Sequence, residues 1–200
     1  MPAPIDYWFD FSSPYGYLGA ELIETLASRH GRSVNWRPLL LGVIFKQTGS
    51  APLTEVPLKG AYSLHDFARS ARFHRVPFRM PSRFPIPAQT PSRIVLWERA
   101  RDPARAARVA QALYRAYFVD DRDISDPDVA AAVAGQVGID IAAARAAVDD
   151  PAVKEALKRE VAQAIAAGVF GSPFVIVDGE PFWGVDRLPQ VDRWLATGGF

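Results

Sequence analysis

The spacing of apolar side chains over residues 5–41 predicts a strand, a helix and a second strand. Apolar side chains occupy every other position from Ile5 to Phe11, which is the period of a strand with one buried face. Leucine and isoleucine then recur at helical spacing between residues 15 and 30, and Gly31 follows where a left-handed cap would end that helix. Residues 34–41 have the pattern of a second strand. The three elements predict a βαβ unit with a right-handed crossover.

The middle of the chain predicts helices. Between residue 42 and about residue 83 the periodicity is lost among proline and glycine, and only residues 64–74 have the pattern of a helix. Helix-start signals follow at Thr90-Pro91, Pro103, Asp126-Pro127, Asp140 and Pro151. The helix predicted over residues 151–167 carries an apolar stripe at i, i+4 spacing.

Residues 169–200 return to strands. Residues 174–177 are apolar, Asp178-Gly179 is a strong signal for a tight hairpin turn, and residues 181–183 form the return strand. Asp186 is placed to cap a final helix. The order βαβ, helices, ββα predicts an α/β protein with a thioredoxin-like fold and a large helical insertion. We expect a discontinuous thioredoxin-like domain of residues 1–45 and 169–200, with residues 46–168 as the inserted helical domain.

The composition excludes several kinds of active site. The 200 residues include no cysteine, which excludes a disulfide, a cysteine nucleophile, a redox CxxC pair and thiolate metal sites. The three histidines lack metal-binding spacing, so we expect no protein-held metal. A net charge of +1 gives no general attraction to nucleic acid, and no apolar run reaches the roughly 20 residues that span a bilayer. The N-terminal residues also lack a signal-peptide pattern, and we expect a cytoplasmic protein without nucleic-acid or membrane partners.

Four motifs, in order along the chain, resemble those of one enzyme family. Residues 9–15 (FDFSSPY) resemble an F-D-x-x-S-P-[FY] motif, and residues 57–62 (PLKGAY) resemble P-x-K-x-x-Y. Residues 171–174 (GSPF) resemble a G-x-P-x segment whose proline is cis, and residues 183–187 (WGVDR) resemble [WF]-G-x-D-R. The chain thus resembles the 2-hydroxychromene-2-carboxylate isomerases and kappa-class glutathione transferases, which share a DsbA-like thioredoxin fold.

Ser13-Pro14 has two interpretations. A serine before a proline commonly caps a helix, with its hydroxyl accepting a hydrogen bond from a backbone N–H. The resemblance implies a catalytic role, because the serine at this place in the family stabilises the thiolate of bound glutathione. A helix N-terminus carries unpaired N–H groups and about half a positive charge, which favours an ionised thiol beside it. One hydroxyl could serve both roles, and Ser12 is the alternative donor.

The resemblance also implies which residues contact glutathione, beyond Ser13. They are Ser50, Lys59, Ser172, Pro173, Val185 and Asp186, to which we add Tyr15 because it directly follows the turn that carries Ser13. In the family the residue before the cis-proline pairs with the cysteinyl backbone, the lysine lies near the glycyl carboxylate, and the Val-Asp pair holds the γ-glutamyl end. Ser50 departs from the asparagine that relatives usually carry. Taken alone, Lys59 fits a surface lysine, Pro173 a loop proline and Asp186 a helix cap.

The resemblance implies a glutathione-dependent isomerase of 2-hydroxychromene-2-carboxylate, a small aromatic acid, giving trans-o-hydroxybenzylidenepyruvate. Relatives are homodimers, so we expect a homodimer. Two alternatives remain open, namely a kappa-class glutathione transferase and a non-redox DsbA-like binding protein. The arginines between residues 69 and 83 fit a solvated face, from which one or two could clamp a substrate carboxylate.

Overall fold

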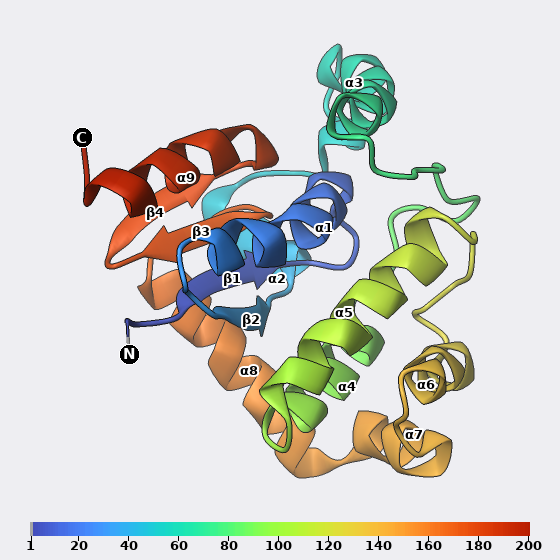
Figure 1. The fold of residues 1–200 in the computed structure, drawn as a ribbon. Coiled ribbons are helices and arrows are strands. Elements are labelled where there is room, and N and C mark those ends of the chain that lie inside the picture. The colour runs from blue at the N-terminus through green and yellow to red at the C-terminus, as the bar shows by residue number, and fades with distance from the viewer. Residues whose placement is uncertain (1) are drawn as a thin grey trace.

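A four-stranded sheet forms the centre of the computed structural model, which describes residues 2–200 (Figure 1). The strand order is β2-β1-β3-β4. β1 (Ile5–Phe9) runs parallel to β2 (Val34–Pro38) and antiparallel to β3 (Phe174–Val177), and β3 pairs antiparallel with β4 (Glu180–Trp183). This is the mixed sheet that a βαβ half and a ββα half make when β1 and β3 pair, and it confirms the predicted fold.

Helices follow the strands β1, β2 and β4. They are α1 (Pro14–Arg29), α2 (Leu41–Thr48), α3 (Lys59–His74), α4 (Gln89–Arg99), α5 (Pro103–Phe118), α6 (Pro127–Gln136), α7 (Ile141–Asp149), α8 (Pro151–Ala166) and α9 (Leu188–Thr197), with 3-10 turns η1 (Leu53–Glu55) and η2 (Val185–Arg187). α3 stands apart from the sheet, whereas α4 to α7 gather at one side of it (Figure 1). No helix in residues 2–200 is long and apolar enough to cross a membrane.

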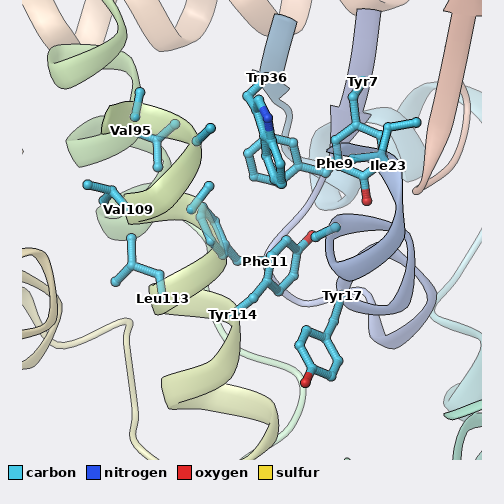
Figure 2. Close-up of a cluster of buried hydrophobic side chains, with 14 of the residues drawn as sticks. Tyr7, Phe9, Phe11, Tyr17, Ile23, Trp36, Val95, Val109, Leu113 and Tyr114 are labelled. Carbon is cyan, nitrogen blue, oxygen red and sulfur yellow. The ribbon is translucent and has the colours of Figure 1, made fainter. Parts of the chain in front are cut away.

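The alternation of β1 divides the interior into two cores. Tyr7 and Phe9 face α1 and α5 and meet Trp36 of β2 and Tyr114 of α5 in a cluster of aromatic rings (Figure 2). Trp8 points the other way, where it packs with apolar residues of α2 and α8. Burying one large apolar side chain contributes about 1.5–3 kcal/mol, so these two layers fix the sheet between the helices.

Most helix starts follow the predicted capping chemistry. The side chains of Ser13, Asp126 and Asp140 accept hydrogen bonds from backbone N–H groups at the starts of α1, α6 and α7. The hairpin between β3 and β4 is also confirmed, because Asp178 and Gly179 both have positive φ, as a tight turn of this hand requires.

Three expected boundaries were wrong. β2 ends at Pro38, and α2 begins at Leu41, in a Leu-Leu-Leu run that has no strand or helix period. α3 begins at Lys59 instead of residue 64. The residue before it is Leu58, whose side chain makes no capping hydrogen bond, so the sequence contained no helix-start signal there. Thr90 does not start α4, which begins at Gln89 without a side-chain cap.

Candidate active site

Ser13 lies where β1 gives way to α1, and its hydroxyl joins two segments of the chain. Ser13 Oγ accepts from the backbone N–H of Gly16 at 3.0 Å, which makes Ser13 the N-cap of α1. The same hydroxyl donates to the backbone carbonyl oxygen of Ser172 at 2.8 Å. Ser13 is 6% exposed, and no acidic residue occupies the first turn of α1. The positive end of the helix dipole is therefore not neutralised from within the helix.

The Ser172-Pro173 peptide bond is cis, as the resemblance implies. Pro173 O accepts from Gly184 N–H at 3.0 Å, which ties this loop to the segment that contains Val185 and Asp186. Ser172 N–H donates to no protein acceptor in residues 2–200. Since the carbonyl oxygen of Ser172 has a second lone pair, this residue keeps both a donor and an acceptor for a peptide lying beside it.

The approach of α1 to the Ser172 loop requires a glycine at position 16. A Cβ there would lie 2.5 Å from Ser172 Oγ and 2.7 Å from Tyr114 Oη, closer than real side chains come. The start of α1 can therefore contact the cis-proline loop only because residue 16 has no side chain.

Asp10 is a buried carboxylate for which the sequence predicts no role. Its two carboxylate oxygens accept from Ser12 N–H at 2.6 Å and Leu41 N–H at 2.7 Å. Its backbone N–H donates to Ser172 Oγ at 3.0 Å, and its carbonyl accepts from Tyr114 Oη at 2.7 Å. Burial raises the pKa of Asp10 from 3.8 to about 6, although the two backbone hydrogen bonds lower it. Asp10 thus links the turn before α1 to α2, α5 and the cis-proline loop.

The signal for Asp10 was present in the sequence. It is a charged residue directly after a strand of large apolar side chains, inside the first of the four motifs. A buried carboxylate at a strand end needs partners, and here backbone N–H groups supply them. Tyr114 had no such signal, because it lies among the apolar positions of α5.

Tyr15 connects the site to α3. Its hydroxyl donates to Asp66 Oδ2 at 2.5 Å, and its ring packs edge-on against Phe67. Burial and the Asp66 carboxylate raise the pKa of Tyr15 above its ordinary value, so the phenol stays protonated. Tyr15 therefore fixes where α3, which begins at Lys59, stands relative to Ser13.

Ser50 and Lys59 are both exposed and lie between the end of α2 and the first turn of α3. Lys59 is the first residue of α3, and Ser50 follows α2, where its hydroxyl accepts from Thr48 Oγ1 at 3.0 Å. Among residues 2–200, no hydrogen bond joins either of them to Ser13 or Ser172. The structure thus brings together Ser13, Tyr15 and the Ser172-Pro173 loop, and does not link Ser50 or Lys59 to them by a hydrogen bond.

Asp186 does not cap the last helix, which corrects one expectation. Val185, Asp186 and Arg187 form the short turn η2, and α9 starts behind Arg187 without a side-chain cap. The Asp186 carboxylate is exposed and accepts from Arg187 Nη1 at 2.7 Å, whereas Val185 is buried. The carboxylate stays exposed at the surface, where it pairs with the neighbouring Arg187.

These groups suit a peptide thiol. Tyr15 N–H at the start of α1 has no acceptor among the described residues, so it and Ser172 N–H are both unpaired donors next to Ser13. An exposed carboxylate at Asp186 and an exposed ammonium at Lys59 complement the two charged ends of glutathione. Within residues 2–200, no three acidic or histidine side chains group as a metal site would require.

The sheet order, the helical insertion and the cis-proline beside a capped helix define a DsbA-like thioredoxin protein. The family model of the DsbA-like thioredoxin domain matches residues 4–196. The chain belongs to this family, in the group of 2-hydroxychromene-2-carboxylate isomerases and kappa-class glutathione transferases.

Individual relatives cover nearly the whole chain. A 2-hydroxychromene-2-carboxylate isomerase of Sphingobium xenophagum is 32% identical over 197 residues, which are 98% of this chain and 99% of that protein. Glutathione S-transferase kappa 2 of Caenorhabditis elegans is 28% identical over 205 residues, which are 96% and 91% of the two chains. A solved structure of a 2-hydroxychromene-2-carboxylate isomerase has the same fold, with a TM-score of 0.87 at 22% identity over 96% of this chain and 94% of that chain.

Proposed function

We propose that this chain is a glutathione-dependent isomerase that converts 2-hydroxychromene-2-carboxylate to trans-o-hydroxybenzylidenepyruvate. The observation that carries the proposal is the position of Ser13 Oγ, between Gly16 N–H of α1 and the carbonyl of Ser172. A chain without cysteine has no thiol of its own, so a thiol nucleophile must come from a bound molecule. Glutathione, when bound, supplies a sulfur nucleophile that adds reversibly to the conjugated double bond of the ring-opened substrate, so that this bond can rotate.

Ser13 would assist by changing its hydrogen-bond partner. Its single proton is donated to Ser172 O, and it must turn away from that oxygen to stabilise a thiolate. The bond from Gly16 N–H keeps Ser13 Oγ in place while the O–H rotates. A hydrogen bond to an ionised acceptor is roughly twice as strong as one between neutral groups, and the N-terminus of α1 adds its positive field.

The remaining residues would hold the tripeptide in an extended form. The backbone of Ser172, turned by the cis bond to Pro173, would pair with the cysteinyl residue as an added strand does. Val185 and Asp186 would receive the γ-glutamyl end, where the carboxylate faces an ammonium. Tyr15, Ser50 and Lys59 would line the opposite end, with Lys59 near the glycyl carboxylate.

We further propose a cytoplasmic homodimer. A cytoplasmic location supplies glutathione in its reduced form, and a chain without cysteine gains nothing from an oxidising compartment. Leu58 and Phe73, at the two ends of α3, are 95% and 81% exposed, and a second subunit would remove such apolar surface from water. Sedimentation equilibrium tests the dimer, because a monomer at all concentrations would contradict it.

The test of the activity is an assay with 2-hydroxychromene-2-carboxylate, with and without glutathione. We expect isomerisation only when glutathione is present. S-methylglutathione is the matched control, because it keeps the peptide and lacks a free thiol, so it should compete for the site without supporting turnover. Equal rates with and without glutathione would contradict the proposal.

A kappa-class transferase is the second candidate, favoured by the 28% identity to glutathione S-transferase kappa 2. It would use the same thiolate and release the conjugate. Release of a conjugate from a halogenated aromatic acceptor, without isomerisation of the chromene, would select this reaction. A DsbA-like binding protein would show neither activity and no affinity for glutathione.

A further inference from the structure

An open groove of about 580 Å³ lies between α4 and α8, next to the start of α2. Its size falls in the range of small-molecule sites. Its floor is apolar, with Leu40, Leu157, Val161 and Ile165. The sheet separates this groove from the aromatic core around α1, because the apolar residues of α2 and α8 cover the face that Trp8 occupies.

Two residues that line the groove are near neighbours, along the chain, of residues that bond to the turn before Ser13. Leu40 of the groove precedes Leu41, whose N–H donates to the Asp10 carboxylate. Gln89 of the groove follows closely after Ile86, whose N–H donates to Ser12 Oγ at 2.9 Å. The groove is thus connected, through Leu41 and Ile86, to the residues that directly precede Ser13.

Arg93 is the cation of the groove that lacks a carboxylate partner. Lys154 pairs with Asp149 and Lys158 with Glu155, but within residues 2–200 no carboxylate lies within salt-bridge distance of Arg93. Arg93 Nη1 donates to the carbonyl of Val148 at 3.2 Å, and Arg93 Nε is buried without any acceptor. Arg93 lines the groove, and a guanidinium is shaped to receive a carboxylate.

Three of the five arginines between residues 69 and 83, which the sequence suggested as a carboxylate clamp, are less available. Arg69 pairs with Asp66, Arg79 with Asp121 and Arg83 with Asp123. Each of these cations already faces an aspartate, so binding a substrate carboxylate would require breaking an existing pair. Arg93 requires no such exchange.

We propose that this groove is the acceptor subsite, in which the ring of a small aromatic acid lies on the apolar floor and its carboxylate binds Arg93. The assignment rests on the proposed function, since it places the chromene-type acid beside the thiol site. It adds a specificity-determining residue, because an uncharged analogue would lose the contact with Arg93.

The test is calorimetric titration of the protein, with and without glutathione, using trans-cinnamate and the uncharged cinnamamide as probes. We expect cinnamate to bind about tenfold more tightly than cinnamamide, equivalent to about 1.4 kcal/mol. Arg93→Met should abolish this preference and leave cinnamamide binding unchanged, whereas Arg93→Lys should retain part of it. Lys154→Met, which removes a groove cation that already has a partner, should keep the full preference.

A second variant tests the groove without touching Arg93. Val43 lines it and is 45% exposed, so Val43→Trp should fill the opening and weaken both probes without disturbing the fold. Leu53→Trp is the control, at 43% exposure outside the groove. Equal affinity for the two probes in the unaltered protein, or unchanged cinnamate binding in Arg93→Met, would overturn the assignment. Arg93-dependent binding of cinnamate by a protein that does not isomerise the chromene would instead overturn the proposed function alone.

Discussion

The hydroxyl of Ser13 donates to the carbonyl oxygen of Ser172 at 2.8 Å, across 159 positions of the chain. This bond joins the N-terminus of α1 to the cis-proline loop. It also marks the place where a bound thiol and a bound peptide backbone would meet, because the same two residues would serve both.

Replacing Ser13 by alanine should lower kcat/KM for isomerisation by roughly 10- to 100-fold, since the thiolate loses one hydrogen-bond donor. The lost helix cap should cost about 1 kcal/mol of unfolding free energy. Steady-state kinetics and urea unfolding measure the two effects. A folded Ser13→Ala enzyme with the full rate would remove Ser13 from the mechanism.

Ser172→Ala should behave differently, because the proposed contacts of Ser172 with glutathione come from its backbone. Glutathione affinity should change by less than about threefold, whereas stability should fall by about 1–3 kcal/mol, because Asp10 N–H loses its acceptor. Calorimetry and urea unfolding would test this. A large loss of glutathione affinity would show that the side chain takes part in binding.

Asp10→Asn should change how stability depends on pH. Since the folded pKa of Asp10 is raised to about 6, the folded state binds its proton more readily than the unfolded state between about pH 4 and pH 6. The contribution of Asp10 to unfolding free energy is therefore largest below pH 4 and declines as pH rises through 6, by roughly 3 kcal/mol. Asparagine does not titrate.

The stability of the unaltered protein minus that of Asp10→Asn should accordingly decrease from about pH 4 to about pH 7. Urea unfolding of both proteins at several pH values gives this difference, in which the other carboxylates cancel. A difference that stays constant with pH would contradict the raised pKa.

Replacing Glu160 tests how much an ion-pair cluster away from Ser13 contributes to the free energy of unfolding. Burial raises its pKa, but hydrogen bonds from Arg99 and Arg37 outweigh burial and hold it below the ordinary value. The ionised Glu160 carboxylate therefore stabilises the fold at pH values above its ordinary pKa, and this stabilisation is lost as pH falls through the lowered pKa of the folded state. Glu160→Ala should cost about 3–5 kcal/mol, since two arginines lose their shared partner, with glutathione affinity unchanged. A cost below about 1 kcal/mol would show that the pairing contributes little.

Much of the fold could be predicted because its signals are local. Ser13-Pro14 and Asp126-Pro127 each predict a helix start from two adjacent residues, and Asp178-Gly179 predicts the hairpin turn. The starts of α2 and α3 could not be predicted, since Leu40 and Leu58 precede them without side-chain cap bonds and tertiary packing decides them. The division into a discontinuous domain and an insertion stays a prediction.

The site was only partly predictable for a related reason. Ser13 and Pro173 stand in recognisable motifs, and the structure places them next to each other. The bonds of Asp10 to Leu41 and Tyr114 join segments far apart in the chain, and no local pattern encodes them. The glutathione contacts of all the residues that the sequence analysis named, and the dimer, stay predictions.

The central claim is that the N-terminus of α1 and Ser13 stabilise the thiolate of bound glutathione. The most direct measurement is the pKa of that thiol in the complex, followed by ultraviolet thiolate absorbance during a pH titration. We predict a pKa at least about one unit below the free thiol value of roughly 8.5, and a shift back toward that value in Ser13→Ala. A bound thiol with an unshifted pKa, or no binding at millimolar glutathione, would contradict the account.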